Sequence, residues 1–279
     1  MKKRRLVLFS IIAVLLLFFG YMKYHKLNVN DIGLKGLSWV KKVKGQAVDF
    51  SDLEKEYVPT VDHDIWTKLL QKHVSLDGMV NYEGFINDSI DLNQYLSLLK
   101  ENSPGENWSA SEKLAYWINV YNAFTVKLIV DHYPLESIKN ISDGFAMINS
   151  SWDLKFFSIG DIPFDLNTVE HEILRKQFDE PRIHFAINCA SVSCPKLRKE
   201  AFYPDQLETQ LEDQAIAFLN NPEKNIISQS ETRLSKIFDW FKSDFNKEAD
   251  LKSYIQKYRP GLNPQNKITF MEYNWGLNN

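Results

Sequence analysis

Residues able to support acid, base or nucleophilic chemistry gather between positions 170 and 194 of the sequence. Cys189 and Cys194 are the two cysteines of the chain, and His184 lies five residues before the first. A thiolate beside a histidine base is the arrangement used in nucleophilic acyl transfer, and a carboxylate such as Glu170 can orient the base. These residues therefore predict a candidate catalytic set of Cys194, Cys189, His184 and Glu170.

The two cysteines leave four interpretations open. Small residues separate them in the stretch CASVSCP, which allows a short disulfide if their Cα atoms come within about 7 Å. Three alternatives to a disulfide remain. One cysteine is a reactive thiol paired with a histidine, or both are inert thiols, or both bind a metal together with His184 or His171. The spacing lacks the tight pairing of familiar zinc sites, so we predict neither a metal nor a cofactor.

The segment around His184 alternates in polarity and predicts a β-strand over residues 182–188. One face would carry Ile183, Phe185 and Ile187, and the other Arg182, His184, Ala186 and Asn188. A polar face of small residues inside an apolar domain favours a ligand pocket. The alternative is a structural histidine whose hydrogen bonds are satisfied within the core.

Glu170 belongs to a helix predicted to follow Asp165, a good N-cap, and to end near Phe178. On a helical wheel Glu170 lies within the apolar arc, whereas His171 and Arg175 point elsewhere. The carboxylate is therefore expected to be buried. It is either a functional acid or base, or part of an ion pair or hydrogen bond that organises the core.

The strongest predicted helix covers residues 109–132 and is apolar on nearly all sides, which predicts that it is central. Asn119 and Asn122 lie outside its narrow polar stripe, so both amides need buried partners. They either tie the helix to a loop or line a pocket. The predicted binding residues are Asn119, Asn122, Asn188, His171 and Arg182.

Composition and the N-terminus restrict the class of protein. The 279 residues carry 33 Lys+Arg and 36 Asp+Glu, a balance that argues against nucleic acid as a partner. A basic tail at residues 1–5 precedes an uncharged apolar run at 6–22, which predicts a transmembrane anchor in the lipid bilayer. We expect a single-pass protein of the inner membrane, with residues 23–60 as a juxtamembrane tether and 61–279 as one extracytoplasmic globular domain.

These elements predict an α+β fold. Behind the N-terminal membrane helix, we expect the buried central helix to pack on a mostly antiparallel sheet, with several helices around it.

Several sequence blocks, in order, resemble the domain-of-unknown-function 547 family. They are LDGMVNY at 76–82, LAYWINVYNA at 114–123, VEHEILR at 169–175, PRIHFA at 181–186, NCAS at 188–191, SCP at 193–195 and YNWGLN at 273–278. The resemblance implies a shared fold unit rather than a known reaction. It also suggests a distant similarity to papain-like or transglutaminase-like folds, in which a central helix packs on an antiparallel sheet.

That analogy fits the chain incompletely. In transglutaminase-like folds the nucleophilic cysteine begins the central helix and precedes the histidine, whereas both cysteines here follow His184. Two functions are therefore expected: a thiol-dependent hydrolase or acyltransferase, or a non-catalytic envelope module. The second would bind a peptide, a glycan or a partner protein and would hold Cys189 and Cys194 as a structural disulfide.

Overall fold

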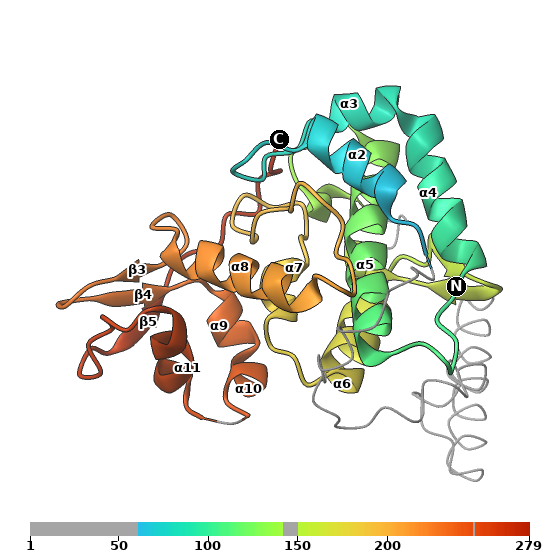
Figure 1. Cartoon of the computed structure of the whole chain (residues 1–279). Coiled ribbons are helices and arrows are strands. Elements are labelled where there is room, and N and C mark those ends of the chain that lie inside the picture. Colours follow the sequence, from blue (N-terminus) through green and yellow to red (C-terminus); the bar gives the residue numbers. More distant parts are fainter. Residues whose placement is uncertain (1–60, 142–149, 248) are drawn as a thin grey trace, which may run out of the picture. The chain divides into compact units, whose positions relative to one another are not determined.

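The described part of the chain is predominantly helical, and its short strands form two separate small sheets. A computed structural model describes residues 61–141, 150–247 and 249–279 (Figure 1). The N-terminal helices are α2 (Asp64–His73), α3 (Tyr82–Asn87), α4 (Ser89–Glu101) and α5 (Ala110–His132). Next come η4 (Ile138–Asn140), η5 (Ser151–Asp153), the hairpin β1 (Phe157–Ile159) and β2 (Ile162–Phe164), the π-helix η6 (Thr168–Leu174), α6 (Arg175–Gln177) and α7 (Ile183–Ala186). The rest comprises α8 (Leu207–Asn220), β3 (Ile226–Ile227), β4 (Thr232–Leu234), α9 (Ile237–Trp240), α10 (Lys242–Phe245), α11 (Leu251–Tyr258) and β5 (Ile268–Phe270).

Helix α5 is central, as the sequence predicts. Its first turn is fixed by a capping box: the Ser109 hydroxyl accepts a hydrogen bond from Glu112 N, and the Glu112 carboxylate accepts one from Ser109 N. Nearly every residue of α5 from Leu114 to Ile129 is buried. Helices α3 and α4 pack on one part of its surface and η6 on another, so the apolar faces of other helices surround it.

The prediction that the central helix packs on a mostly antiparallel sheet is wrong. Strands β1 and β2 form a two-stranded antiparallel hairpin, and β4 pairs antiparallel with β3 and parallel with β5. In the described part of the chain each strand spans three residues or fewer, which is too short to cover a 23-residue helix. Helices fill the place that we expected a sheet to take.

The predicted strand at 182–188 is also wrong, because residues 183–186 form the short helix α7. The amides of His184, Phe185 and Ile187 donate to the carbonyls of Pro181, Arg182 and Ile183. All four residues of α7 are buried, so neither of the two expected faces is a solvent face. The alternating polarity therefore does not reflect a half-buried strand in this segment.

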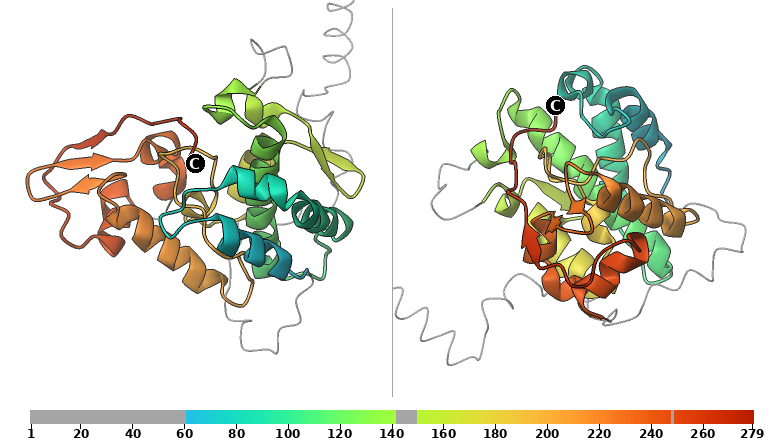
Figure 2. Two further views of the ribbon diagram at one scale, coloured as in Figure 1. Left: turned by 90° about the horizontal axis from the view of Figure 1, so that it is seen from above. Right: turned by 90° about the vertical axis from the view of Figure 1, so that its left-hand side faces the viewer.

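A second apolar cluster lies in the C-terminal half. Phe185 of α7 packs there with Phe218 of α8, Phe238 of α9, Phe245 of α10 and Ile255 of α11. Figures 1 and 2 show α9 and α11 close to β3–β5, and the final segment returns from β5 toward α2 and α3. Its end is fixed there because Asn278 O accepts a hydrogen bond from Val80 N.

The expected membrane anchor requires correction. Within residues 61–141, 150–247 and 249–279, no helix combines the length and the apolar composition needed to cross a bilayer. The single-pass inner-membrane arrangement expected from the sequence thus has no spanning helix within these described ranges. Residues 6–22, to which the sequence assigns the anchor and the contact with lipid, lie outside the described residues, as do the tail at 1–5 and the tether at 23–60.

Candidate functional site

A pocket of about 250 Å³ lies where α5, η6, α7, α9 and the C-terminal segment meet. Five of the nine predicted site residues line it: Glu170, His171, His184, Cys189 and Cys194. They come from three local structures, namely the π-helix η6, the short helix α7 and the turn that follows α7. These five side chains come from one 25-residue stretch of the sequence, and the packing of its three local structures turns them toward the same pocket.

Glu170 is buried at the base of this site, with 8% of its surface exposed. The Tyr121 hydroxyl of α5 donates a hydrogen bond of 3.0 Å to Glu170 Oε2. Burial raises the pKa of Glu170 to about 7, although the Tyr121 hydrogen bond and the charge of Arg175 act in the opposite direction. The described residues form no ion pair with this carboxylate, because Arg175 is paired with Asp244 instead.

The π-helical turn explains why His171 lies in the pocket beside Glu170. Arg175 N donates to Glu170 O, which is the i to i+5 bond of a π-helix. The wider turn rotates less per residue than an α-helix, so consecutive side chains point in more similar directions. The wheel used for the sequence assumed an α-helix and therefore turned His171 away from the pocket.

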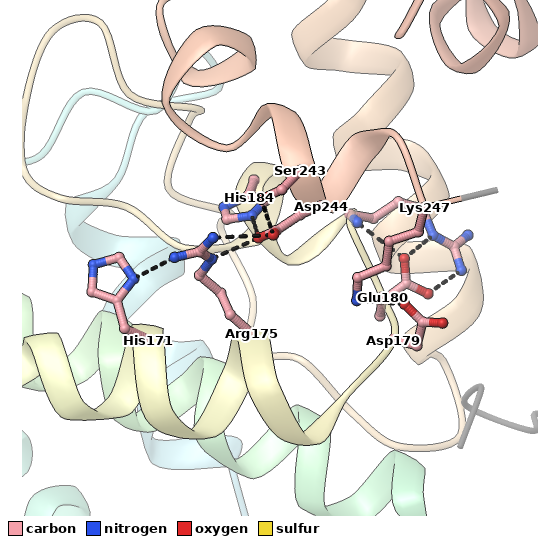
Figure 3. Close-up of polar contacts among 9 residues, drawn as sticks. His171, Arg175, Asp179, Glu180, His184, Ser243, Asp244 and Lys247 are labelled. Atoms are coloured by element: carbon pink, nitrogen blue, oxygen red, sulfur yellow. Dashed lines mark hydrogen bonds and ion pairs between the residues drawn. The ribbon is translucent and has the colours of Figure 1, made fainter. Parts of the chain in front are cut away.

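His184 is held by a charged network that the sequence does not predict (Figure 3). Its Nε2 atom lies 2.8 Å from Asp244 Oδ2. Arg175 donates to both oxygens of Asp244, at 2.6 and 3.0 Å, and its Nη1 lies 2.9 Å from His171 Nδ1. Asp244 therefore joins the two histidines through Arg175 and takes the orienting role that we predicted for Glu170.

The network also sets the protonation of the two histidines. Burial alone would raise the pKa of Asp244, but hydrogen bonds from His184 and Arg175 hold it well below its usual range. Burial lowers the pKa of His184 and of His171. With Asp244 ionised and His184 neutral, the Nε2 proton faces Asp244 and Nδ1 carries the lone pair. That Nδ1 atom is buried and has no hydrogen-bond partner among the described residues.

Cys189 and Cys194 form a disulfide, with their Cα atoms 6.3 Å apart. This confirms one of the four interpretations of the cysteines. The Tyr273 hydroxyl lies 3.2 Å from the sulfur of Cys189 and 3.1 Å from that of Cys194. Because disulfide sulfurs carry no proton, Tyr273 is the donor. Neither sulfur is bonded to His184, so no thiol and base pair exists in this state.

Aromatic rings make up most of the remaining wall. Trp240 of α9 lies 4.8 Å from Tyr273 and 5.7 Å from Trp275, measured between ring centroids, and Tyr273 lies 4.5 Å from Trp275. Phe241 stacks on His184 at 4.0 Å, and Trp152 closes the cluster against Trp275. Trp240 remains 43% exposed, so this wall is open to solvent.

The three predicted asparagines lie outside the pocket and hold segments of backbone. The Asn119 side chain donates to Phe202 O and accepts from Phe202 N, at 2.8 and 2.9 Å. Asn122 does the same for Ala186 O and Asn188 N, at 3.0 and 2.8 Å. Asn188 in turn donates to Pro195 O and accepts from Ala190 N. Asn122 and Asn188 thus position α7 and the disulfide turn on α5, and Asn119 attaches the segment at Phe202 to the same helix.

Arg182 is the other predicted residue that lies outside the pocket. Its guanidinium contacts Glu180, Glu208 and Glu212, with shortest distances of 2.7, 2.7 and 3.3 Å. This cluster joins the start of α7 to α8. None of its members lines the aromatic pocket, and the cluster organises the fold.

Sequence reasoning missed several residues that shape the pocket. Asp244 contacts His184 across 60 positions of the chain. The sequence feature that could have indicated Asp244 is the pair Phe241 and Phe245. These two rings are spaced by about one helical turn around Asp244, and both pack against His184. Tyr273 lies within a block that resembles the family, but no local pattern assigned it a role.

The fold and the site define a mainly helical α+β domain with an aromatic pocket and a disulfide at its edge. Residues 105–219 of this domain match the family model described as "Protein of unknown function, DUF547". The match confirms the family resemblance, and it includes Tyr121, Glu170, His184 and the disulfide. Among the curated proteins and the solved structures, none matches the chain, so the comparisons lend no support to the papain-like analogy.

Proposed function

We propose that this domain is a non-catalytic binding module whose ligand enters the aromatic pocket, with Cys189 and Cys194 as a structural disulfide. The disulfide is the observation that carries the proposal, because a thiol nucleophile needs a free sulfur beside its base. The two sulfurs are bonded to each other, and His184 Nδ1 forms a hydrogen bond with neither of them.

The walls of the pocket support binding of a small ligand. Exposed aromatic rings beside a few convergent polar groups are typical of ligand sites. Trp240 and Tyr273 offer ring faces, whereas Glu170 and His171 offer hydrogen-bonding atoms. A volume of about 250 Å³ suits a small molecule or a single protruding group better than an extended chain.

A ligand screen with a matched pair of variants tests this proposal. The full chain is screened by ligand-observed NMR against free amines, sugars and short peptides. Trp240→Ala should weaken each pocket ligand by about tenfold, the equivalent of about 1.4 kcal/mol. Ile90→Ala removes an 82% exposed residue of α4 and should change nothing. Ligands that are equally strong on Trp240→Ala, or no ligand at all, would contradict the proposal.

A thiol-dependent hydrolase is the second candidate, and the His184 and Asp244 pair favours it. A histidine held at one nitrogen by a carboxylate, with no hydrogen bond from the described residues at its other nitrogen, resembles the base of a nucleophilic triad. This function requires reduction of the disulfide by a dithiol, which would free Cys189 and Cys194. Hydrolysis of an activated ester that appears only after reduction, and is lost in one of Cys189→Ser and Cys194→Ser, would favour it over binding alone.

A further inference from the structure

The acid of the pocket lacks a positive partner. Glu170 is buried, its Oε2 accepts only from Tyr121, and no Lys or Arg of the described residues lies within ion-pair distance of it. Removing a carboxylate from water is costly unless a cation or a proton compensates the charge. A ligand that brings a cation would supply what the protein does not.

The neighbouring charges leave room for such a cation. Arg175 is engaged by Asp244 in a two-pronged ion pair, and the two histidines of the wall are neutral because burial lowers the pKa of each. The lining of the pocket therefore contains the Glu170 carboxylate and no Lys or Arg, and the charge of Arg175 reaches Glu170 only from outside the lining. An anionic ligand would be repelled by the ionised form of Glu170.

The aromatic wall is suited to the same kind of ligand. Ring faces attract cations through their quadrupole, and tryptophan does so best. Two rings of this pocket already hold cations of the protein: Lys139 Nζ lies 3.7 Å from the centroid of Trp275, and the Arg175 guanidinium carbon lies 4.9 Å from that of Phe241. Trp240 and Tyr273 have no such partner in the described part of the chain.

We infer that the pocket binds a small organic ammonium ion, which lies between the Glu170 carboxylate and the rings of Trp240 and Tyr273. This inference rests on the proposed binding function and adds the chemical class of the ligand. The volume of about 250 Å³ accommodates such an ion together with the few carbon atoms that carry it.

Isosteric pairs of probes test the charge separately from the shape. Choline is compared with dimethylbutanol, in which carbon replaces nitrogen, and benzylamine is compared with benzyl alcohol. Binding to the full chain is measured by tryptophan fluorescence and calorimetry. Each cation should bind at least about tenfold more tightly than its neutral counterpart. Glu170→Gln should abolish that preference, whereas Glu172→Gln, on the exposed side of the same helix, should preserve it.

The dependence on pH provides a second readout. The ammonium ion binds the ionised carboxylate, and the pKa of Glu170 is about 7, so affinity should rise as the pH increases through 7. The groups that face Glu170 are Tyr121 from α5, Arg175 from α6, Asp244 from α10 and Tyr273 from the C-terminal segment. None of these titrates near pH 7, and burial lowers the pKa of the two other titratable groups of the lining, His171 and His184, from its ordinary value. The trend should disappear in Glu170→Gln and should be absent for the neutral probes.

Three outcomes separate this inference from the proposed function. Preference for the cations that Glu170→Gln abolishes supports both. Equal binding of charged and neutral probes, weakened by Trp240→Ala, overturns the ammonium inference and leaves the binding module standing. Binding of neither cation overturns the inference, and the wider ligand screen then decides the binding function by itself.

Discussion

Glu170 makes the stability of the protein depend on pH in an unusual direction for an acid. Burying a carboxyl group costs less free energy when the group is protonated and neutral. Folding therefore raises the pKa of Glu170 from 4.5 to about 7. The folded state therefore binds the proton more tightly, and the stabilisation is complete below pH 4.5. It is lost as the pH rises toward 7. We expect this single group to lower the free energy of unfolding by on the order of 3 kcal/mol across that interval.

Urea unfolding of Glu170→Gln at several pH values measures this contribution. The wild-type protein should lose stability relative to the variant as the pH rises from about 4.5 to about 7. Glu172→Gln is the control, because Glu172 lies on the solvent side of η6 and pairs with Lys176. Parallel curves for the wild-type protein and Glu170→Gln would contradict the prediction.

Asn119 should contribute to stability through its two hydrogen bonds with Phe202. Asn119→Ala leaves the buried amide and carbonyl of Phe202 without partners, which costs on the order of 1 to 3 kcal/mol. Thermal unfolding should show a lower Tm. Asn93→Ala, on an exposed position of α4, should leave the Tm nearly unchanged. If both variants melt like the wild-type protein, the hydrogen bonds of Asn119 carry little net free energy.

Arg182 should be more costly to replace than an exposed arginine. Arg182→Met leaves the buried Glu180 without its partner, and breaking such a pair costs about 3 to 5 kcal/mol. Arg233 is a suitable control, since it pairs with Glu231 at the surface, where ion pairs contribute about 1 kcal/mol or less. Chemical denaturation of Arg182→Met and Arg233→Met should therefore give clearly different losses. Equal losses would show that the cluster is replaceable.

At this scale the sequence predicts burial better than contacts. Helical spacing placed Asn119, Asn122 and Glu170 inside, and all three are buried. It did not reveal that Asp244 orients His184, because that contact depends on how α10 packs against α7 and not on any local pattern. A single sequence shows which side chains must avoid water, but their partners are determined by tertiary packing.

Among the elements, the disulfide turn is the one whose chemistry can be tested most directly. Alkylation of the denatured, unreduced protein should label neither Cys189 nor Cys194, and reduction should allow both to be labelled. Reduction should also destabilise the fold by about 2 kcal/mol in the loop-entropy model, since the loop is short. Mass spectrometry and unfolding curves measure the two effects. The double variant Cys189→Ala/Cys194→Ala should be insensitive to reductant, and labelling before reduction would contradict the bond.

Helices were easier to predict than the segments between them. Helix α5 has both a strong apolar pattern and a capping box, so its position and burial follow from local sequence. Helix α7 has four residues and is buried on all sides, which leaves no contrast between a wet and a dry face to read. The π-helix η6 keeps the apolar spacing of a helix but changes the direction of each side chain, which moved His171 into the pocket.

The architecture of the whole molecule was the hardest level to predict. The α+β class follows from the mixture of helical patterns and short β-prone runs, but the expected sheet depended on an analogy with another fold. The helices that surround α5 provide the apolar surface that we had assigned to that sheet. The choice between these partners depends on contacts between distant segments, about which local periodicity contains no information.

Recovery of the pocket after unfolding should lag behind recovery of the helices. Its walls come from Tyr121, Glu170, Trp240 and Trp275, which span more than half of the chain. Contacts between such distant segments form slowly, because the intervening chain must first lose its freedom. In stopped-flow refolding with the disulfide intact, far-ultraviolet dichroism should recover before the tryptophan fluorescence of the pocket. Trp240→Phe identifies the reporting residue, and identical rates for both signals would exclude a late pocket.

A pocket assembled from remote segments also links occupancy to the lifetime of the protein. No partly folded chain contains all of its walls, so a ligand of this pocket binds the finished molecule alone. Such a ligand shifts the folding equilibrium toward the native state by mass action. Since proteases act on the open chain, the supply of ligand would set how much protein survives as well as how much is occupied. Under the proposed binding function, the aromatic wall would thereby couple the abundance of the protein to the concentration of its ligand.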